Sequence, residues 1–151
     1  MLEKGNSVPK LEYFFHPNFE NVLNLLQDNA LPIEDLKTQD LNNFIGYGDQ
    51  SELGAVIGLE LHGESALLRS LVLKDSIRKQ GIGTQLVHKI EERARLLRVK
   101  KIFLLTATAR NFFIRLGYQE IERDSLPSEI KRTEEFTTLC PTSSSILMKI
   151  L

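Results

Sequence analysis

Apolar residues are grouped along this chain in short runs, each ended by polar turn residues. Runs of this length and composition predict strands at residues 11–16, 44–48, 53–61, 66–73, 101–106, 118–122 and 145–150. The second, third and fourth of these runs follow one another through tight polar turns, which is typical of an antiparallel meander.

Other segments show the spacing and the end signals of helices. Asn18 is placed to cap the first helix, whose buried stripe is Val22, Leu25 and Leu26. The longest helix begins near residue 82, and its apolar positions recur at helical spacing: Leu86, Ile90, Ala94 and Leu97. Shorter helices are predicted at residues 34–41, 108–116 and 128–136, and Gly117 ends the second of them.

The order of these elements predicts the fold class. The strand at residues 66–73, the long helix and the strand at 101–106 imply a parallel strand pair with a right-handed crossover. Together with the meander, they predict an α+β fold: a mixed, mostly antiparallel sheet with helices on both faces. No repeat or linker interrupts the sequence, so we expect residues 1–151 to form a single domain.

Composition excludes several function classes. The formal net charge is −1 and no apolar run approaches membrane-spanning length, which argues against nucleic acid or a membrane as a partner. Cys140 is the single cysteine, so neither an internal disulfide nor a cysteine zinc cluster is expected. The histidines, His16, His62 and His88, show no metal-ligand spacing. Because the start of the chain lacks a signal-peptide pattern, we expect a cytoplasmic protein.

The most informative segment is the turn that leads into the long helix. It reads R-K-Q-G-I-G from Arg78 to Gly83. The first backbone N–H groups of a helix have no intrahelical partner, and they carry the positive end of the helix dipole. Glycines allow several of these groups to converge on phosphate oxygens, while Arg78 and Lys79 add positive charge. The turn therefore predicts a pyrophosphate site.

Two common phosphate-binding motifs do not fit this turn. The dinucleotide-binding motif requires a third glycine where this chain has Leu86, and a Walker loop requires a lysine where it has Thr84. The pattern R-x-x-G-x-G does fit. A surface glycine turn that only begins a helix would show the same residues, so the remainder of the chain has to distinguish the two interpretations.

The remainder of the chain resembles the GCN5-related N-acetyltransferase (GNAT) superfamily. The likeness covers nearly the whole chain, through the order of elements, the glycine loop and the segment LLTATARNFFIRLGY, which ends in Gly117-Tyr118. It implies acetyl-CoA as the co-substrate. The segments VIGLELHGESALLRSLVL and LPSEIKRTEEFTTLCP further resemble acetyltransferases of arsenic-resistance operons and short N-acetylglutamate synthases. Both relatives imply a small, amino-acid-like acceptor rather than a protein.

The resemblance also implies where acetyl-CoA binds. In this fold the parallel strand pair splays at a bulge, and one strand pairs with the pantetheine arm through its backbone. By position, the strand residues are Leu71, Val72 and Leu73. The cofactor loop would comprise Arg78, Lys79, Gln80, Gly81, Ile82, Gly83 and Thr84, with the pyrophosphate on Gln80 to Thr84.

Glu60 is the candidate catalytic residue. The attacking amine must be uncharged, and roughly a tenth of α-amino groups are already neutral at pH 7, so modest help from a general base is enough. Glu60 lies inside an apolar strand, where a carboxylate is unusual unless it is paired. His62 and Glu64 are less well placed alternatives, and an outward-facing glutamate on an edge strand is the plainer interpretation.

Arg69 and Thr106 are the candidate acceptor-binding residues. A guanidinium in the middle of LLRSLVL cannot be buried unpaired, and its planar fork matches a carboxylate. The alternative for Arg69 is an ion pair with one of the chain's own carboxylates. Thr106 would bond the substrate or cap the following helix. Phe113 stands where many GNAT enzymes have the tyrosine that protonates the leaving thiolate, so no general acid is assigned.

These observations predict an acetyl-CoA-dependent N-acetyltransferase acting by direct transfer. Its acceptor would be a small molecule with an amine and, because of Arg69, a carboxylate: an amino acid or an amino-acid-like toxin. Acetylation of glutamate is an alternative within this class. A non-catalytic acyl-CoA-binding regulatory module is the alternative outside it, because Phe113 replaces the usual tyrosine. The exposed sheet edge is compatible with a homodimer.

Overall fold

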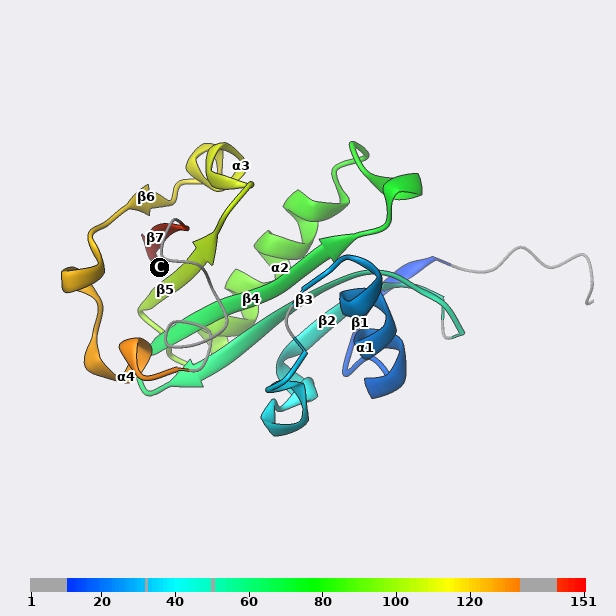
Figure 1. Ribbon diagram of the computed structural model, residues 1–151, viewed down its shortest axis with the longest axis horizontal. Helices are drawn as coiled ribbons and strands as arrows, with labels where there is room; N and C mark the ends of the chain where they lie inside the picture. The colour runs from blue at the N-terminus through cyan, green and yellow to red at the C-terminus, as the bar shows by residue number, and fades with distance from the viewer. Residues whose placement is uncertain (1–10, 32, 50, 134–143) are drawn as a thin grey trace, which may run out of the picture.

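The computed structural model describes residues 11–31, 33–49, 51–133 and 144–151, which form one seven-stranded sheet in the order β1-β2-β3-β4-β5-β7-β6 (Figure 1). The strands are β1 (Glu12–Phe15), β2 (Phe44–Gly48), β3 (Leu53–His62), β4 (Ser65–Leu73), β5 (Lys101–Thr106), β6 (Gln119–Glu120) and β7 (Ser145–Ile150). The α-helices are α1 (Phe19–Asp28), α2 (Ile82–Leu96), α3 (Arg110–Arg115) and α4 (Ser128–Lys131).

The α+β class and the connectivity predicted from the sequence are confirmed. β2, β3 and β4 form the antiparallel meander, and β4 and β5 are the parallel pair joined through α2. Asn18 caps α1 as predicted, since its side-chain oxygen accepts from the backbone N–H of Asn21 at 3.1 Å. The helix predicted at 128–136 is shorter than expected, because α4 ends at Lys131 with Arg132 as its C-cap. Cys140 and residues 134–136 lie outside the described residues.

The helix predicted at residues 34–41 is wrong. This segment forms two short 3₁₀ turns instead, at Leu36–Thr38 and Leu41–Asn43. The Asp40 side chain accepts from the backbone N–H of Asn42 at 2.9 Å, so it starts a new turn where a continuous helix would have to pass. The predicted helix at 108–116 is also shorter, because the Thr106 hydroxyl oxygen accepts from the backbone N–H of Ala109 at 2.9 Å.

Helices cover the two faces of the sheet (Figure 1), and each face has its own hydrophobic cluster. On one face α2 packs its buried stripe onto β2, β3 and β4, and Ala66 and Leu68 of β4 point into this cluster. On the other face α1 packs onto β3 and β4, where Val72 points toward it. Leu67 shares a third cluster with Ile130 of α4. Alternation along a strand places Arg69 on the same face as Leu67, which is the face opposite α2.

A bulge in β4 changes this alternation. Gly58 of β3 pairs with Arg69 and Val56 pairs with Val72, so one residue of β3 faces two residues of β4, Ser70 and Leu71. Ser70 adopts φ of 61°, a left-handed conformation that is uncommon for residues other than glycine. The extra residue turns the Leu71 side chain toward α2, although Arg69, two positions earlier, faces the opposite side.

β4 and β5 separate soon after they begin. Their parallel register runs only from Ser65–Lys101 to Leu67–Phe103, and Figure 1 shows the two strands diverging beyond this point. β5 continues to pair with β7 on its other side up to Thr106. The splayed parallel pair expected from the family resemblance is therefore present.

A polar contact centred on the buried Glu91 connects α2 to the strands beyond the β4–β5 opening. Tyr118 donates its hydroxyl hydrogen to Glu91 at 2.9 Å, and Lys149 of β7 donates to both Glu91 oxygens at 3.1 and 3.2 Å. Burial raises the pKa of the Tyr118 hydroxyl well above its usual value, and the nearby Glu91 carboxylate acts in the same direction. The three side chains thus keep α2 in place across the β4–β5 opening.

We expect Gly58→Ala to destabilise the fold, because a Cβ at this position would lie 2.4 Å from the fully buried Phe44 ring. Overpacking of this kind costs about 1–3 kcal/mol in the free energy of unfolding. Urea denaturation compares it with Gly54→Ala, whose Cβ would lie 3.2 Å from the mobile end of the Ile77 side chain. Equal midpoints for the two variants would contradict the assigned packing.

Candidate functional site

The open side of β4 presents backbone groups that β5 does not pair. Lys74 donates its N–H to the Gly54 carbonyl of β3 at 2.9 Å. Because backbone groups alternate in direction along an antiparallel strand, the groups of Leu73 and of Leu71 point to the opposite side, toward the β4–β5 opening. Of the three predicted strand residues, Leu71 and Leu73 are therefore oriented to bind a ligand through the backbone, whereas the groups of Val72 face β3.

The glycine loop leads from the end of β4 to the start of α2. Gly81 precedes the helix with φ of 81°, and no side chain caps the helix start. The first hydrogen bond of the helix runs from the N–H of Gln85 to the carbonyl of Gly81 at 3.1 Å, so the N–H groups of Ile82, Gly83 and Thr84 come before the hydrogen-bonded ladder. This is the geometry that the sequence predicted for an anion site.

The two loop glycines serve different purposes. A Cβ on Gly81 would meet no atom within 4 Å, so the backbone angle alone requires glycine here, and the space above it is open. A Cβ on Gly83 would lie 3.5 Å from Phe112 of α3 and 3.7 Å from Leu73 of β4. Gly83 therefore faces the opening between β4 and α3.

Two polar side chains of the loop, those of Arg78 and Gln80, donate to nearby backbone carbonyls. Arg78 donates Nε–H to the Leu73 carbonyl at 3.2 Å, and its Nη1 pairs with an Asp75 oxygen at 3.1 Å. Gln80 donates its amide to the Ser76 carbonyl at 3.3 Å. Lys79 is exposed with φ of 65°. Arg78 thus bridges the strand end and the loop, at the mouth of the predicted pyrophosphate site.

An ionic network lies on the face of the sheet opposite α2. Both Nη atoms of Arg69 donate to Asp35, at 2.6 and 2.7 Å, and Nη1 also donates to Glu60 at 3.0 Å. Arg69 Nε lies 3.3 Å from the Ser70 hydroxyl at the bulge. Arg69 therefore takes part in an ion pair with the chain's own carboxylates, which was the alternative to acceptor binding. Its role toward an acceptor stays a prediction.

Glu60 links this network to His62. Its second carboxylate oxygen lies 2.6 Å from His62 Nε2. The side chains of Glu60 and His62 are 17% and 24% exposed, whereas those of Arg69 and Asp35 are 2% and 4% exposed. Glu60 is paired with Leu67, the last β4 residue in register with β5. The candidate base thus lies where the two strands begin to part, and it is held there rather than turned to solvent.

The two remaining candidates have structural partners. Thr106 caps the turn before α3 through the contact with Ala109 described above, and it is half-buried. Phe113 is buried and packs edge-to-face against Phe112 and Tyr118, with ring centroids 5.0 and 5.4 Å apart. Phe113 offers no proton donor, and Phe112 is the aromatic residue of α3 that lies next to Gly83.

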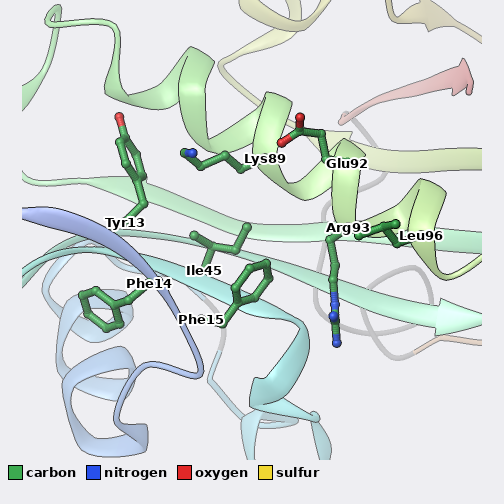
Figure 2. A pocket seen from close by; sticks show the side chains of 8 residues that line it. All are labelled: Tyr13, Phe14, Phe15, Ile45, Lys89, Glu92, Arg93 and Leu96. Atoms are coloured by element: carbon green, nitrogen blue, oxygen red, sulfur yellow. The ribbon is translucent and has the colours of Figure 1, made fainter.

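A separate groove of about 240 Å³ lies between β1 and the exposed side of α2 (Figure 2). Tyr13 and Phe15 form one wall, with Lys89 Nζ 5.0 Å from the Tyr13 ring centroid and the Arg93 guanidinium 5.3 Å from that of Phe15. None of the predicted site residues lines this groove. Among the described residues, no cluster of histidine, cysteine or acidic side chains could hold a metal ion, and no helix is both long and apolar enough to cross a membrane.

The glycine loop and the open β4–β5 pair agree with the comparison to known families. Residues 40–120, more than half of the chain, match the acetyltransferase (GNAT) domain family. The chain therefore belongs to the GNAT acetyltransferase family, whose typical co-substrate is acetyl-CoA. The match includes β2 to β6, and with them the meander, the loop and the splayed pair.

Individual relatives match parts of the chain. An uncharacterised N-acetyltransferase from Chlorobaculum tepidum is 40% identical over 76 residues, 50% of this chain and 46% of the relative. An amino-acid acetyltransferase from Pseudomonas syringae is 37% identical over 65 residues, 43% of this chain and 15% of the relative. The chain thus spans less than half the length of either curated relative. Neither match bears on an arsenic-resistance role.

A solved structure shows the same fold over nearly the whole chain. The N-acetylglutamate synthase of Neisseria gonorrhoeae, complexed with coenzyme A and N-acetyl-glutamate, superposes with a TM-score of 0.78 at 17% identity. The superposition covers 96% of this chain and 36% of that protein. At this identity the likeness establishes the fold.

Sequence reasoning missed Asp35 and the contact between Glu60 and His62. Asp35 lies in the segment mispredicted as a helix, 34 residues from its partner Arg69, and no local pattern indicates a pair so distant in sequence. The spacing of Glu60 and His62 did carry a signal. Two residues separated by one position on a strand point to the same face, so their side chains can touch.

We expect Gly81→Val to weaken binding of coenzyme A by at least tenfold, because the branched side chain opposes a φ of 81° and occupies the open space above the loop. Gly63→Val is the matched control. Gly63 also has a positive φ, 65°, and open space around it, but it lies in the β3–β4 turn. Isothermal titration calorimetry measures both variants. Equal weakening by the two substitutions would contradict a specific role for the loop.

Proposed function

We propose that this chain is an acetyl-CoA-dependent N-acetyltransferase acting on a small-molecule amine by direct transfer. The observation that carries the proposal is the continuity between two features: the backbone groups of Leu71 and Leu73 that face the β4–β5 opening, and the glycine helix start at Gly81–Thr84. The first offers a strand edge to the pantetheine amides, and the second offers N–H groups to the pyrophosphate. One extended ligand with both chemistries spans them.

The reaction needs little from the protein besides placement. Acetyl-CoA supplies the thioester: the neutral amine nitrogen attacks its carbonyl carbon, a C–N bond forms, the C–S bond breaks, and the departing thiolate takes up a proton. An acceptor that arrives as an ammonium ion first loses one proton to the base, and the nitrogen loses a second proton once the C–N bond has formed, which balances the proton that the thiolate takes up. Holding the two reactants together in a water-poor site supplies much of the rate, and a base adds the remainder.

Glu60 is the base that we propose. Its carboxylate is fixed by Arg69 on one oxygen and faces His62 with the other. Its strand partner Leu67 lies about 13 Å along β4 from Leu71, four residues at about 3.3 Å each. Glu60 therefore lies beyond the strand edge that would hold pantetheine, and it takes the amine proton there. The thiolate is protonated by water, because Phe113 replaces the usual tyrosine.

The acceptor class follows from the relatives. The Pseudomonas syringae relative is an amino-acid acetyltransferase, and the superposed synthase structure holds N-acetyl-glutamate. These names support an amino acid or a compound of similar size as the acceptor. An arsenic-containing amino acid belongs to this class of acceptors. The cytoplasmic location and the homodimer remain predictions from the sequence.

We expect Glu60→Gln to lower kcat/KM for the acceptor by about 10²–10⁴-fold, the usual contribution of a general base. The amide keeps an oxygen for the Arg69 contact but cannot accept the amine proton. Affinity for coenzyme A should remain unchanged. Glu120→Gln is the control, since Glu120 is exposed and pairs with Arg110. Thiol release from acetyl-CoA is the assay.

The same assay distinguishes the regulatory alternative. If coenzyme A binds tightly but no member of a panel of amino acids and simple amines releases thiol, the acetyltransferase proposal fails. A non-catalytic acyl-CoA-binding module would then account for the site.

A further inference from the structure

We infer that Arg69 is a positioning residue for Glu60, and that the acceptor is recognised as an amine by Glu60 and His62 without needing a carboxylate of its own. This inference rests on the proposed function and deepens it. It replaces the carboxylate-binding role predicted for Arg69 from the sequence, and it widens the acceptor class to amines whose neighbouring group is uncharged.

The N–H donors of Arg69 are already bonded to the chain's own residues. A guanidinium binds a carboxylate best as a planar fork, with two parallel N–H donors. In this protein the fork of Nη1 and Nη2 already holds Asp35, at 2.6 and 2.7 Å. Nη1 also donates to Glu60, and Nε lies against the Ser70 hydroxyl. An acceptor carboxylate would have to displace Asp35, and it would leave that buried carboxylate without its ion pair.

Glu60 and His62 are more accessible to solvent than Arg69. The Arg69 and Asp35 side chains are 2% and 4% exposed, whereas Glu60 and His62 are 17% and 24% exposed. A molecule arriving from solvent on this face therefore reaches Glu60 and His62 before it reaches Arg69. The groups that it meets are a carboxylate and an imidazole, both of which can bind the N–H bonds of an amine.

The net charge of the network also favours an amine over a carboxylate. Asp35 and Glu60 contribute two negative charges and Arg69 one positive charge, so with a neutral His62 these four side chains carry a net charge of −1. A negative cluster of this kind attracts an ammonium group and repels a carboxylate. The acceptor amine arrives mostly as an ammonium ion, so the cluster favours the reacting end of the acceptor.

The network also explains how Arg69 acts at a distance from the acceptor. It joins Ser70 at the bulge, Asp35 on the loop after α1 and Glu60 on β3, so it sets the orientation of the Glu60 carboxylate relative to β4. A shift of about 1 Å in a positioned catalytic group can cost about 10²-fold in rate. Weakening the network should therefore slow the transfer without changing which acceptor is preferred.

The test uses matched acceptor pairs, each an amino acid and its neutral 1-amide: L-leucine with L-leucinamide, and L-phenylalanine with L-phenylalaninamide. Steady-state kinetics compare the wild-type chain, Arg69→Lys and Asp35→Asn. The amide-to-acid ratio of kcat/KM is the readout, because the same two compounds are compared on every variant and their different amine pKa values cancel. Circular dichroism and coenzyme A affinity verify that each variant is folded.

If Arg69 positions Glu60, Arg69→Lys lowers kcat by about 10²-fold for acid and amide alike, and the ratio stays within about twofold. Asp35→Asn should do the same, since it loosens the same network. If Arg69 binds the acceptor carboxylate, Arg69→Lys raises KM for the acid alone. In that case Asp35→Asn frees the guanidinium and raises kcat/KM for the acid. Either of these two results overturns the inference.

The two variants report independently, so one that fails to fold leaves the other as a complete test. Failure of this inference also differs from failure of the proposed function. An enzyme that acetylates the amino acids and rejects their amides contradicts the inference and supports the function, whereas absence of thiol release with every compound contradicts the function itself.

Discussion

The structure depends on one interruption of hydrogen bonding, the point at which β4 loses its partner β5. Backbone N–H and C=O groups are almost always paired when they are buried, so a strand edge that stays open inside a fold requires a reason. Here the register of the two strands ends at Leu67–Phe103, and the bulge at Ser70 and Leu71 bends β4 just beyond that point. The left-handed conformation of Ser70 costs about 1–3 kcal/mol, which the surrounding sheet has to offset.

The rest of the fold holds this opening in place. α2 spans it on one face, and the buried contact of Glu91 with Tyr118 and Lys149 connects that helix to the strands beyond the opening. The glycine loop then lies at the end of β4 because the loop is short and both of its ends are fixed. On the opposite face, the network around Arg69 starts at the bulge and ends at Glu60. The opening thus offers backbone groups that suit an extended cofactor, and the face opposite α2 offers the charged side chains that we propose for the acceptor amine.

Different parts of the protein differ in how far the sequence predicts them. The strands were predictable because their apolar runs are bounded by strong turn residues, and three of them have the predicted bounds. The loop was predictable because its contacts are local: Arg78, Gly81 and Gly83 all act within a few residues of one another. The segment at 34–41 was not, because Asp40 bonds the backbone locally and competes with the helix.

The interpretation of Arg69 shows the limit of sequence reasoning. An arginine inside an apolar strand requires a negative partner, and that requirement could be read from the sequence alone. The identity of the partner depends on how a distant loop folds back over the sheet. That loop places a carboxylate oxygen of Asp35 2.6 Å from Nη1 of Arg69. Long-range pairs of this kind arise from tertiary packing and leave no periodic trace. For the same reason, the sequence indicated Glu60 as a candidate but not the residues that orient it.

The most direct test of this account is backbone amide hydrogen exchange with and without coenzyme A. If the cofactor completes the open edge of β4, exchange at Leu71 and Leu73 slows on binding, together with exchange at Gly83 and Thr84. Exchange at Val72 should change little, because its N–H already faces β3. Slowing in the groove formed by β1 and α2, with Leu71 and Leu73 unaffected, would contradict the account.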